Sequence, residues 1–322
     1  MKGMDRRSFL KSSFAADGAL AVAGAQGALS RASFLKTATL ICLILFLGAC
    51  EKATKEMPLI TGIAEVNGAK LYYEQMGDGH PMILIHGFSV NTRMWDDQFE
   101  NFAKYYKVVR YDVRGFGKSS IPEEPYSHSK DLSSLMEFLA IDKAYLIGLS
   151  MGGGIAIDFT VEYPEKVDAL IPVDMALSGY KWSDEFVQRS FVKYPSIARN
   201  EGVSEAIQEW LDDPLFAPAL KNSPVGKKLK DIVSSYSGFH LLNPDPQIQM
   251  EPPAIERLSE IRVPTLIVLG ELDTPDFHLI ADTLVSRIKG AKRIVIPDAG
   301  HIINMEKPAE FNKIVLDFLA NI

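Results

Sequence analysis

The sequence contains very little cysteine. Only Cys42 and Cys50 occur among its 322 residues, and both lie in the N-terminal segment. Residues 51–322 therefore lack the thiols for a disulfide framework or a cysteine zinc site. The folded part must be stabilised by a packed hydrophobic core, which a chain of this length can supply.

Positive charge is also scarce. Lysine and arginine total 34 against 41 aspartates and glutamates, which gives a formal net charge of −7. The densest basic run, Lys227 to Lys230, is typical of a solvated helix face. Nucleic-acid-binding domains carry clustered basic charge, so we expect no nucleic-acid partner.

No apolar run is long enough to span a bilayer. The longest, Thr37–Ala49, falls short of the ~20 residues that a spanning helix needs and has the length of a signal-peptide core. It ends in Leu47-Gly48-Ala49-Cys50, which resembles a bacterial lipobox, and Asp5-Arg6-Arg7-Ser8-Phe9 resembles a twin-arginine export motif. The lipobox resemblance implies that Cys50 is lipidated and begins the mature chain.

We therefore expect residues 1–50 to be an export and lipoprotein signal and residues 51–57 to be a polar tether. The protein would be held on the membrane of the cell envelope, on its periplasmic or extracellular face, through the lipid on Cys50. Two signals in tandem also fit an internal start codon, and a simple N-terminal anchor helix is the alternative to lipidation.

What the remaining sequence does contain is an alternation of strands and helices over residues 58–174 and 254–322. Short apolar runs and Asn67-Gly68, a strong hairpin signal, predict the strands. They are Gly62–Val66, Lys70–Gln75, Met82–Ile85, Lys107–Tyr111, Ala144–Ile147, Ala169–Val173, Val263–Leu269 and Lys292–Ile296. Helices are predicted at Lys130–Leu139, from the glycines after Met151 to about Tyr163, at Phe277–Ile288 and at Pro308–Leu319.

Residues 175–253 interrupt this alternation. They are rich in aromatic and helix-forming residues and contain no all-apolar strand, which predicts a helical cap. The fold class is therefore α/β: a mostly parallel sheet with helices on both faces, an antiparallel hairpin at its edge and an inserted helical lid.

The strongest functional motif is Gly148-Leu149-Ser150-Met151-Gly152, which lies between a predicted strand and a predicted helix. This context predicts a nucleophile elbow that exposes the Ser150 hydroxyl at the tip of the sheet. A glycine-rich turn, such as a phosphate-binding loop, is the alternative. The residues that follow the later strands decide between the two.

Acyl transfer by serine needs a base and a carboxylate that orients the base. Asp273 follows the predicted strand that ends at Leu269, and His301 follows the strand that ends at Ile296. The three residues then follow the chain order Ser150, Asp273, His301, which is the order of the triads in hydrolases that have a nucleophile elbow. Asp276 and Asp174 compete with Asp273 as the acid, whereas Asp298 fits a turn residue better.

The developing oxyanion requires two backbone N–H donors. One is expected from Met151, directly after the nucleophile, and the other from Phe88 in the loop after Met82–Ile85. His86 has no neighbouring cluster of histidines or carboxylates, so we do not predict a metal site there.

Five motifs together resemble the α/β-hydrolase superfamily, from about Ile60 onward. They are His86-Gly87-Phe88, Asp112-Val113-Arg114-Gly115-Phe116-Gly117-Lys118-Ser119, Gly148-Leu149-Ser150-Met151-Gly152-Gly153, Gly270-Glu271-Leu272-Asp273 and Ala299-Gly300-His301. The set looks most like small serine esterases and enol-lactonases with a helical cap. The resemblance implies a hydrolase without metal or cofactor, in which Asp112 and Arg114 are structural. Ser150 stands where haloalkane dehalogenases and epoxide hydrolases have an aspartate, which argues against both activities.

We expect a serine hydrolase that cleaves carboxylic esters or lactones through an acyl-enzyme on Ser150. The aromatic residues of the cap suggest a small apolar substrate, although most of these rings fit a packing role better. The same triad serves carbon–carbon bond hydrolases, proline-type aminopeptidases and perhydrolases, which remain alternatives. A non-catalytic ligand-binding module is the alternative outside the enzymes.

Overall fold

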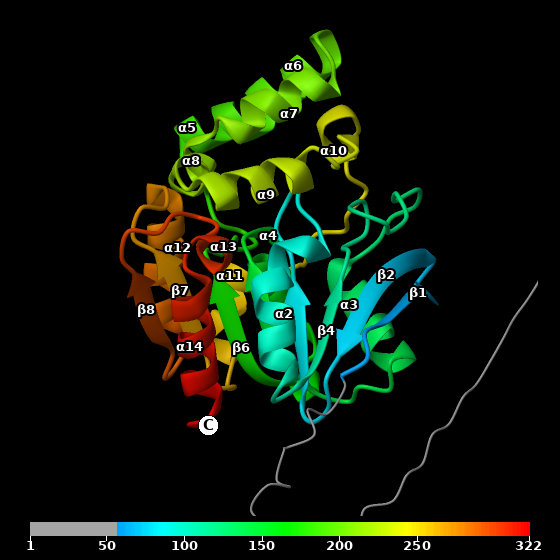
Figure 1. Ribbon diagram of the computed structural model, residues 1–322, viewed down its shortest axis with the longest axis vertical. Helices are drawn as coiled ribbons and strands as arrows, with labels where there is room; N and C mark the ends of the chain where they lie inside the picture. Colours follow the sequence, from blue (N-terminus) through cyan, green and yellow to red (C-terminus); the bar gives the residue numbers. More distant parts are fainter. Residues whose placement is uncertain (1–56) are drawn as a thin grey trace, which may run out of the picture. The chain divides into compact units, whose positions relative to one another are not determined.

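The computed structural model describes residues 57–322, and these form an eight-stranded sheet in the order β1-β2-β4-β3-β5-β6-β7-β8 (Figure 1). The strands are β1 (Ile60–Val66), β2 (Ala69–Met76), β3 (Pro81–Ile85), β4 (Lys107–Tyr111), β5 (Ala144–Leu149), β6 (Val167–Val173), β7 (Leu266–Gly270) and β8 (Lys292–Ile296). β2 runs antiparallel to both of its neighbours, and every other neighbouring pair is parallel. This is the α/β-hydrolase architecture that the sequence predicts.

The predicted hairpin forms the edge of the sheet. Val66 pairs with Ala69, and Asn67 and Gly68 between them have φ of 47° and 70°. Positive φ at both central residues defines the tight turn whose twist matches that of the flanking strands. Asn and Gly are the residues that adopt it at least cost, so the prediction from this dipeptide is confirmed.

Helices cover both faces of the sheet and create two hydrophobic layers. One layer holds α3 (His128–Phe138), α4 (Met151–Glu162), α11 (Ala254–Arg257) and α12 (Pro275–Arg287), and the other holds α2 (Asp96–Ala103), α13 (Ile303–Glu306) and α14 (Pro308–Leu319). Successive residues of β3 alternate between the layers: Ile83 and Ile85 face the first, Met82 and Leu84 the second. The central strands are therefore apolar on both sides, as in parallel sheets generally.

Proline residues lie where β6 and β7 pair. β7 begins at Leu266 and not at Val263, because Pro264 has no N–H to donate to a ladder. Pro172 lies inside β6, as predicted. Leu170 N–H donates to Pro264 O and Asp174 N–H to Val268 O, so position 172 between them faces β7. The missing N–H of Pro172 is therefore one cause of the interruption in the β6–β7 ladder.

Two helices also begin earlier than expected. α3 begins at His128 and not at Lys130, because Ser127 caps it by accepting a hydrogen bond from the Lys130 N–H. α12 begins at Pro275 and not at Phe277, with proline in the first turn, where its missing N–H has no helical partner to lose.

Residues 175–253 contain a set of short helices that lies over the carboxyl ends of the strands (Figure 1). They are α5 (Asp184–Val187), the π-helical turn Gln188–Lys193, α6 (Tyr194–Asn200), α7 (Val203–Leu211), α8 (Ala217–Lys221), α9 (Ser223–Val233) and α10 (Phe239–Leu242). Polar contacts join this cap to the core. Trp210 Nε1 donates to Ser89 Oγ at 2.7 Å, and Arg93 forms a 2.6 Å ion pair with Asp231.

No helix in the described part of the chain is long and apolar enough to cross a membrane. Residues 1–56, with the expected signal, nearly all of the tether and Cys50, lie outside the described residues.

Candidate active site

Ser150 occupies a sharp turn between β5 and α4. Its backbone has φ of 56° and ψ of −116°, a region that L-residues rarely adopt. Its N–H donates to Val173 O, and its carbonyl accepts from Gly154 and Ala176. Three backbone hydrogen bonds therefore hold the strained turn in place.

The flanking glycines are required by close packing. A Cβ on Gly148 would lie 2.1 Å from Gly152 O, and a Cβ on Gly152 would lie 2.2 Å from Ile85 O. Both neighbours are backbone atoms, which cannot rotate away. The first turn of α4 thus rests directly on the end of β3, and this contact sets where Ser150 emerges.

His301 and Asp273 meet on the loops after β8 and β7. His301 Nδ1 lies 2.8 Å from Asp273 Oδ2, and both residues are buried. Asp273 Oδ1 accepts from the Thr274 N–H, and the Phe277 ring packs 4.4 Å from the imidazole centroid. A carboxylate acceptor fixes the proton on Nδ1 and leaves Nε2 able to accept a proton. Ser150 and His301 line the same cavity.

The two competing carboxylates have other partners. Asp276 accepts hydrogen bonds from the Tyr180 hydroxyl and the Ser183 hydroxyl. Asp174 is fully buried and accepts from the Gly270 N–H. Burial and the nearby Asp273 carboxylate raise the pKa of Asp174 well above its ordinary value, which favours its neutral form.

The loop after β3 places Phe88 over the elbow. Gly87 approaches the Ser150 Cβ so closely that a Cβ on the glycine would lie 3.4 Å from it. No hydrogen bond among the described residues engages the Phe88 N–H, and Met151 begins α4, where helical N–H groups lack intrahelical partners. Both predicted donors are thus at the cavity with their N–H groups unengaged.

His86 holds this loop, a role that the sequence analysis missed. Its Nε2 accepts from the Val113 N–H at 2.9 Å, and its Nδ1 lies 2.7 Å from Gly87 O. Because Nε2 accepts a hydrogen bond, the ring proton belongs on Nδ1, and burial lowers the pKa of His86, which favours this neutral form. An apolar strand followed by His-Gly is the only local signal for such a brace.

Asp112 and Arg114 have structural contacts, as the resemblance implies. Asp112 accepts from the backbone N–H groups of Thr92 and Lys118, both at 2.8 Å. Arg114 forms a buried ion pair with Asp131 at 2.6 Å. Neither residue lines the cavity that holds Ser150.

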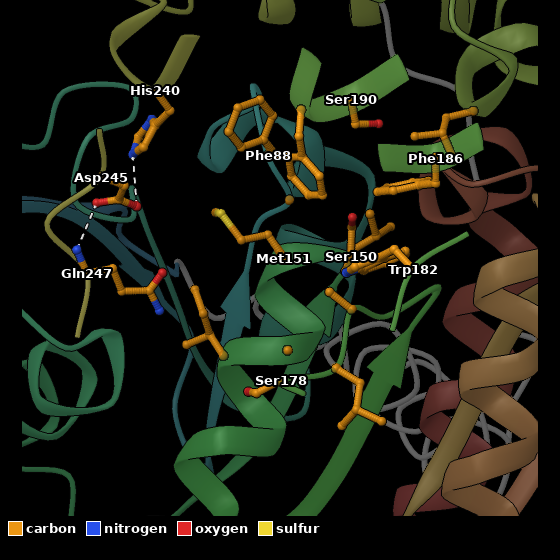
Figure 2. Close-up of a pocket in the computed structure, with 18 of the residues that line it drawn as sticks. Phe88, Ser150, Met151, Ser178, Trp182, Phe186, Ser190, His240, Asp245 and Gln247 are labelled. Carbon is orange, nitrogen blue, oxygen red and sulfur yellow. Dashed lines mark hydrogen bonds and ion pairs between the residues drawn. The ribbon is translucent and has the colours of Figure 1, made fainter. Parts of the chain in front are cut away.

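The cavity above Ser150 has a volume of about 660 Å³ and lies between core and cap. Aromatic side chains point into it from core and cap: Phe88 from the loop after β3, and Trp182 and Phe186 from one segment of the cap (Figure 2). Its lining also includes the polar residues Ser178, Asp245 and Gln247. No lysine or arginine is among the described residues that line it.

The only cluster among the described residues that could hold a metal ion is Asp174, Asp273 and His301, whose ligand atoms lie within 4.8 Å of one another. The Asp273 oxygens contact His301 Nδ1 and the Thr274 N–H, and Asp174 Oδ1 accepts from the Gly270 N–H, whereas Asp174 Oδ2 has no hydrogen-bond partner. The direct contact of Asp273 with His301 joins two of the three groups, so we assign no metal to the cluster.

Comparison with known proteins places the chain in a family. The profile of the alpha/beta hydrolase fold family matches residues 80–308, so the chain belongs to this family of hydrolases. Among curated relatives, a 2-hydroxy-6-oxo-6-phenylhexa-2,4-dienoate hydrolase of Comamonas testosteroni is 28% identical over 272 residues, which covers 77% of this chain and 91% of the relative.

Two solved structures show the same architecture. The enol-lactonase from Burkholderia xenovorans LB400 has a TM-score of 0.66 and 26% identity, and the match covers 80% of this chain and all of that one. A thermophilic esterase from Thermogutta terrifontis has a TM-score of 0.67 and 25% identity, covering 81% of this chain and 98% of that one. The chain is thus similar to hydrolases of esters, lactones and carbon–carbon bonds.

Proposed function

We propose that this protein is a serine hydrolase that cleaves carboxylic esters or lactones through an acyl-enzyme on Ser150. The observation that carries the proposal is the 2.8 Å contact of His301 Nδ1 with Asp273. His301 lines the same cavity as Ser150. A histidine oriented in this way accepts the Ser150 proton on Nε2.

The reaction has two half-reactions. The Ser150 oxygen attacks the ester carbonyl while Nε2 of His301 takes its proton, and the N–H groups of Phe88 and Met151 stabilise the oxyanion. The alcohol leaves with the proton from His301. Water, deprotonated by the same nitrogen, then attacks the acyl-enzyme and releases the acid.

Cavity charge favours an ester or lactone over the carbon–carbon bond substrate of the Comamonas relative. That relative is named for a dienoate, which carries a carboxylate. The described wall of this cavity offers no lysine or arginine to pair with it, and it holds Asp158 and Asp245 instead. Burying an unpaired anion beside two carboxylates is unfavourable.

Hydrolysis of 4-nitrophenyl acyl esters of increasing chain length tests the proposal, with Ser150→Ala as the control. We expect turnover in the native protein and a loss of several orders of magnitude in the variant. Undiminished turnover in Ser150→Ala would refute it. Labelling of Ser150 by a fluorophosphonate without turnover of any ester or lactone would instead support a ligand-binding role.

We also propose that the mature protein is anchored through a lipid on Cys50. The resemblance of Leu47-Gly48-Ala49-Cys50 to a lipobox supports this. Metabolic labelling with palmitate in a bacterial host should mark the native chain and the Cys42→Ser control, and should fail in Cys50→Ser. Equal labelling of both variants, or an intact mass with the leader uncleaved, would contradict the anchor.

A further inference from the structure

A carboxyl group with no cationic partner lines the cavity at a distance from Ser150. One face of α4 forms this wall, with Met151, Gly154, Ile155 and Asp158 at helical spacing. At a rise of 1.5 Å per residue, Asp158 lies about 12 Å beyond Ser150 along the helix axis. A continuous surface therefore leads from the nucleophile to this carboxyl.

The hydrogen bonding of Asp158 is incomplete. The Ser178 hydroxyl donates to Asp158 Oδ1, and Figure 2 shows Ser178 beside the elbow helix, below Ser150. Within the described chain, Oδ2 has no hydrogen bond, and no lysine, arginine or histidine forms an ion pair with Asp158. One carboxylate oxygen thus remains available to a ligand.

The surroundings of Asp158 carry more negative than positive charge. A smaller cavity of about 150 Å³ adjoins the first and shares His128, Asp158, Gln247 and Gln249 with it. Glu162 and Glu251 line that smaller cavity, against a single cation, Lys130. Burial raises the pKa of Asp158 to about 7, and Glu162 adds to the effect. A largely buried carboxylate is stabilised when a cation approaches it.

We propose that Asp158 forms a second subsite, which binds an ammonium group at the end of the substrate remote from the scissile bond. The proposal rests on the proposed function, because the substrate must reach Ser150 and Asp158 together. An N–H donor on that ammonium would pair with Oδ2, while Ser178 continues to occupy Oδ1. The aromatic residues nearer to Ser150 would enclose the apolar chain between the two polar ends.

A matched pair of esters tests the subsite in the full-length protein. One ester carries a terminal dimethylammonio group, and in its isostere an isopropyl group replaces that group, at each of several chain lengths. At the length that spans the helix face, we expect the ratio of their kcat/KM values to favour the ammonium ester by about tenfold. Asp158→Asn should remove this preference, because asparagine still accepts from Ser178 but carries no charge.

Two controls separate the subsite from general effects. Glu162→Gln removes one negative charge from the same helix, one turn further on and at an exposed position outside the main cavity. It should keep most of the preference. Ser178→Ala removes a hydrogen bond that lowers the pKa of Asp158, so it should move the preference to higher pH without abolishing it.

The preference should also depend on pH. The titratable groups that border Asp158 are His128 on α3, Glu162 on its own helix, and Glu251 and Lys130 across the smaller cavity. Burial lowers the pKa of His128 to about 3, so His128 stays neutral near pH 7. The ratio should therefore rise from pH 5 to pH 8 as Asp158 ionises, whereas ionisation of the catalytic base cancels from the ratio.

Equal ratios in the native protein and Asp158→Asn would overturn the subsite and leave the esterase proposal intact, because the isopropyl ester would still be hydrolysed through Ser150. If no ester is hydrolysed, the proposed function fails. Calorimetric titration of the full-length protein with an alkyl dimethylammonium salt then decides the subsite alone. Binding that weakens about tenfold in Asp158→Asn supports it, and equal or absent binding overturns it.

Discussion

The Ser150 backbone is strained in the folded state. Its φ of 56° with ψ of −116° is a conformation that costs about 1–3 kcal/mol in a residue with a side chain. Hydrogen bonds from Ser150 to Val173 and from Gly154 and Ala176 to Ser150 hold it there. If Ser150 is the nucleophile that we propose, the turn that exposes its hydroxyl does so at a cost in stability.

Substitutions of Ser150 should separate its effect on stability from its effect on turnover. Ser150→Ala and Ser150→Gly both lack the nucleophile and should lose ester turnover by several orders of magnitude. Glycine adopts positive φ without strain. We therefore expect the free energy of unfolding of Ser150→Gly to be about 1 kcal/mol larger than that of Ser150→Ala. Urea denaturation of both variants measures the difference. Equal stabilities would mean that the turn is not strained.

Replacing the neighbouring acids Asp174 and Asp273 by asparagine should have different effects on turnover. Burial raises the pKa of Asp174 and favours its neutral form, and asparagine would still accept from the Gly270 N–H, so Asp174→Asn should keep kcat/KM within a few-fold. Asp273→Asn should lower kcat by about 10⁴, because its amide reverses the hydrogen bond to His301. Steady-state kinetics of both variants tests the assignment. The opposite ranking would identify Asp174 as the acid.

At the scale of elements, the position of α4 depends on its contact with β3. A Cβ on Gly152 would meet the Ile85 carbonyl, whereas a Cβ on Gly154 meets nothing closer than 3.4 Å. Gly152→Ala should therefore displace the helix start and Met151, lowering both stability, by about 2 kcal/mol or more, and kcat. Gly154→Ala, on the same helix, should fold normally. Denaturation and kcat of the pair provide the measurement, and equal effects would contradict this packing.

Local chemistry explains how much of these elements the sequence could predict. The elbow, the Asn67-Gly68 hairpin and the order Ser150, Asp273, His301 follow from residue patterns that act over a few positions. The start of a helix depends on a capping residue such as Ser127, whose side chain accepts a backbone hydrogen bond. The pattern of apolar residues does not encode that hydrogen bond. Element types were therefore predictable, and several boundaries were not.

The parts that escaped prediction depend on contacts distant in sequence. His86 becomes a brace only because Val113 comes within hydrogen-bond distance, and Asp158 lines the cavity only because the loop with Ser178 lies beside α4. The one signal for Asp158 was its place seven residues after Met151, on the same helix face. That spacing is shared by many buried helix positions, so it could not single out a site.

At the scale of the whole molecule, cap and core are joined directly above the oxyanion loop. Trp210 of α7 donates to Ser89, which is buried and follows Phe88, and its ring packs edge-to-face on Phe88 at 5.9 Å. The Phe88 ring also contacts Phe116 and Tyr236. A movement of the cap is thus coupled to the backbone that carries one of the proposed oxyanion donors.

Trp210→Phe tests this coupling. The variant keeps an aromatic ring but leaves buried Ser89 without its donor, so we expect a loss of about 1–2 kcal/mol of stability and a several-fold lower kcat. Trp182→Phe is the matched control: it also lines the cavity from the cap, and no hydrogen bond of the described residues involves its indole nitrogen. Denaturation and kcat should separate the two variants. Identical behaviour would exclude a specific role for the Trp210 bond.

The proposed nucleophile and its base come from opposite sides of the cap insertion, on loops after β5 and β8. During synthesis Ser150 emerges well before Asp273 and His301, so a partly made chain contains no complete triad. β8 is an edge strand whose Ile294 and Val295 remain substantially exposed. Fraying of this strand would release His301 while the central strands stay paired. Ester turnover would then report the integrity of one sheet edge, and it should fade during heating before the bulk of the secondary structure is lost.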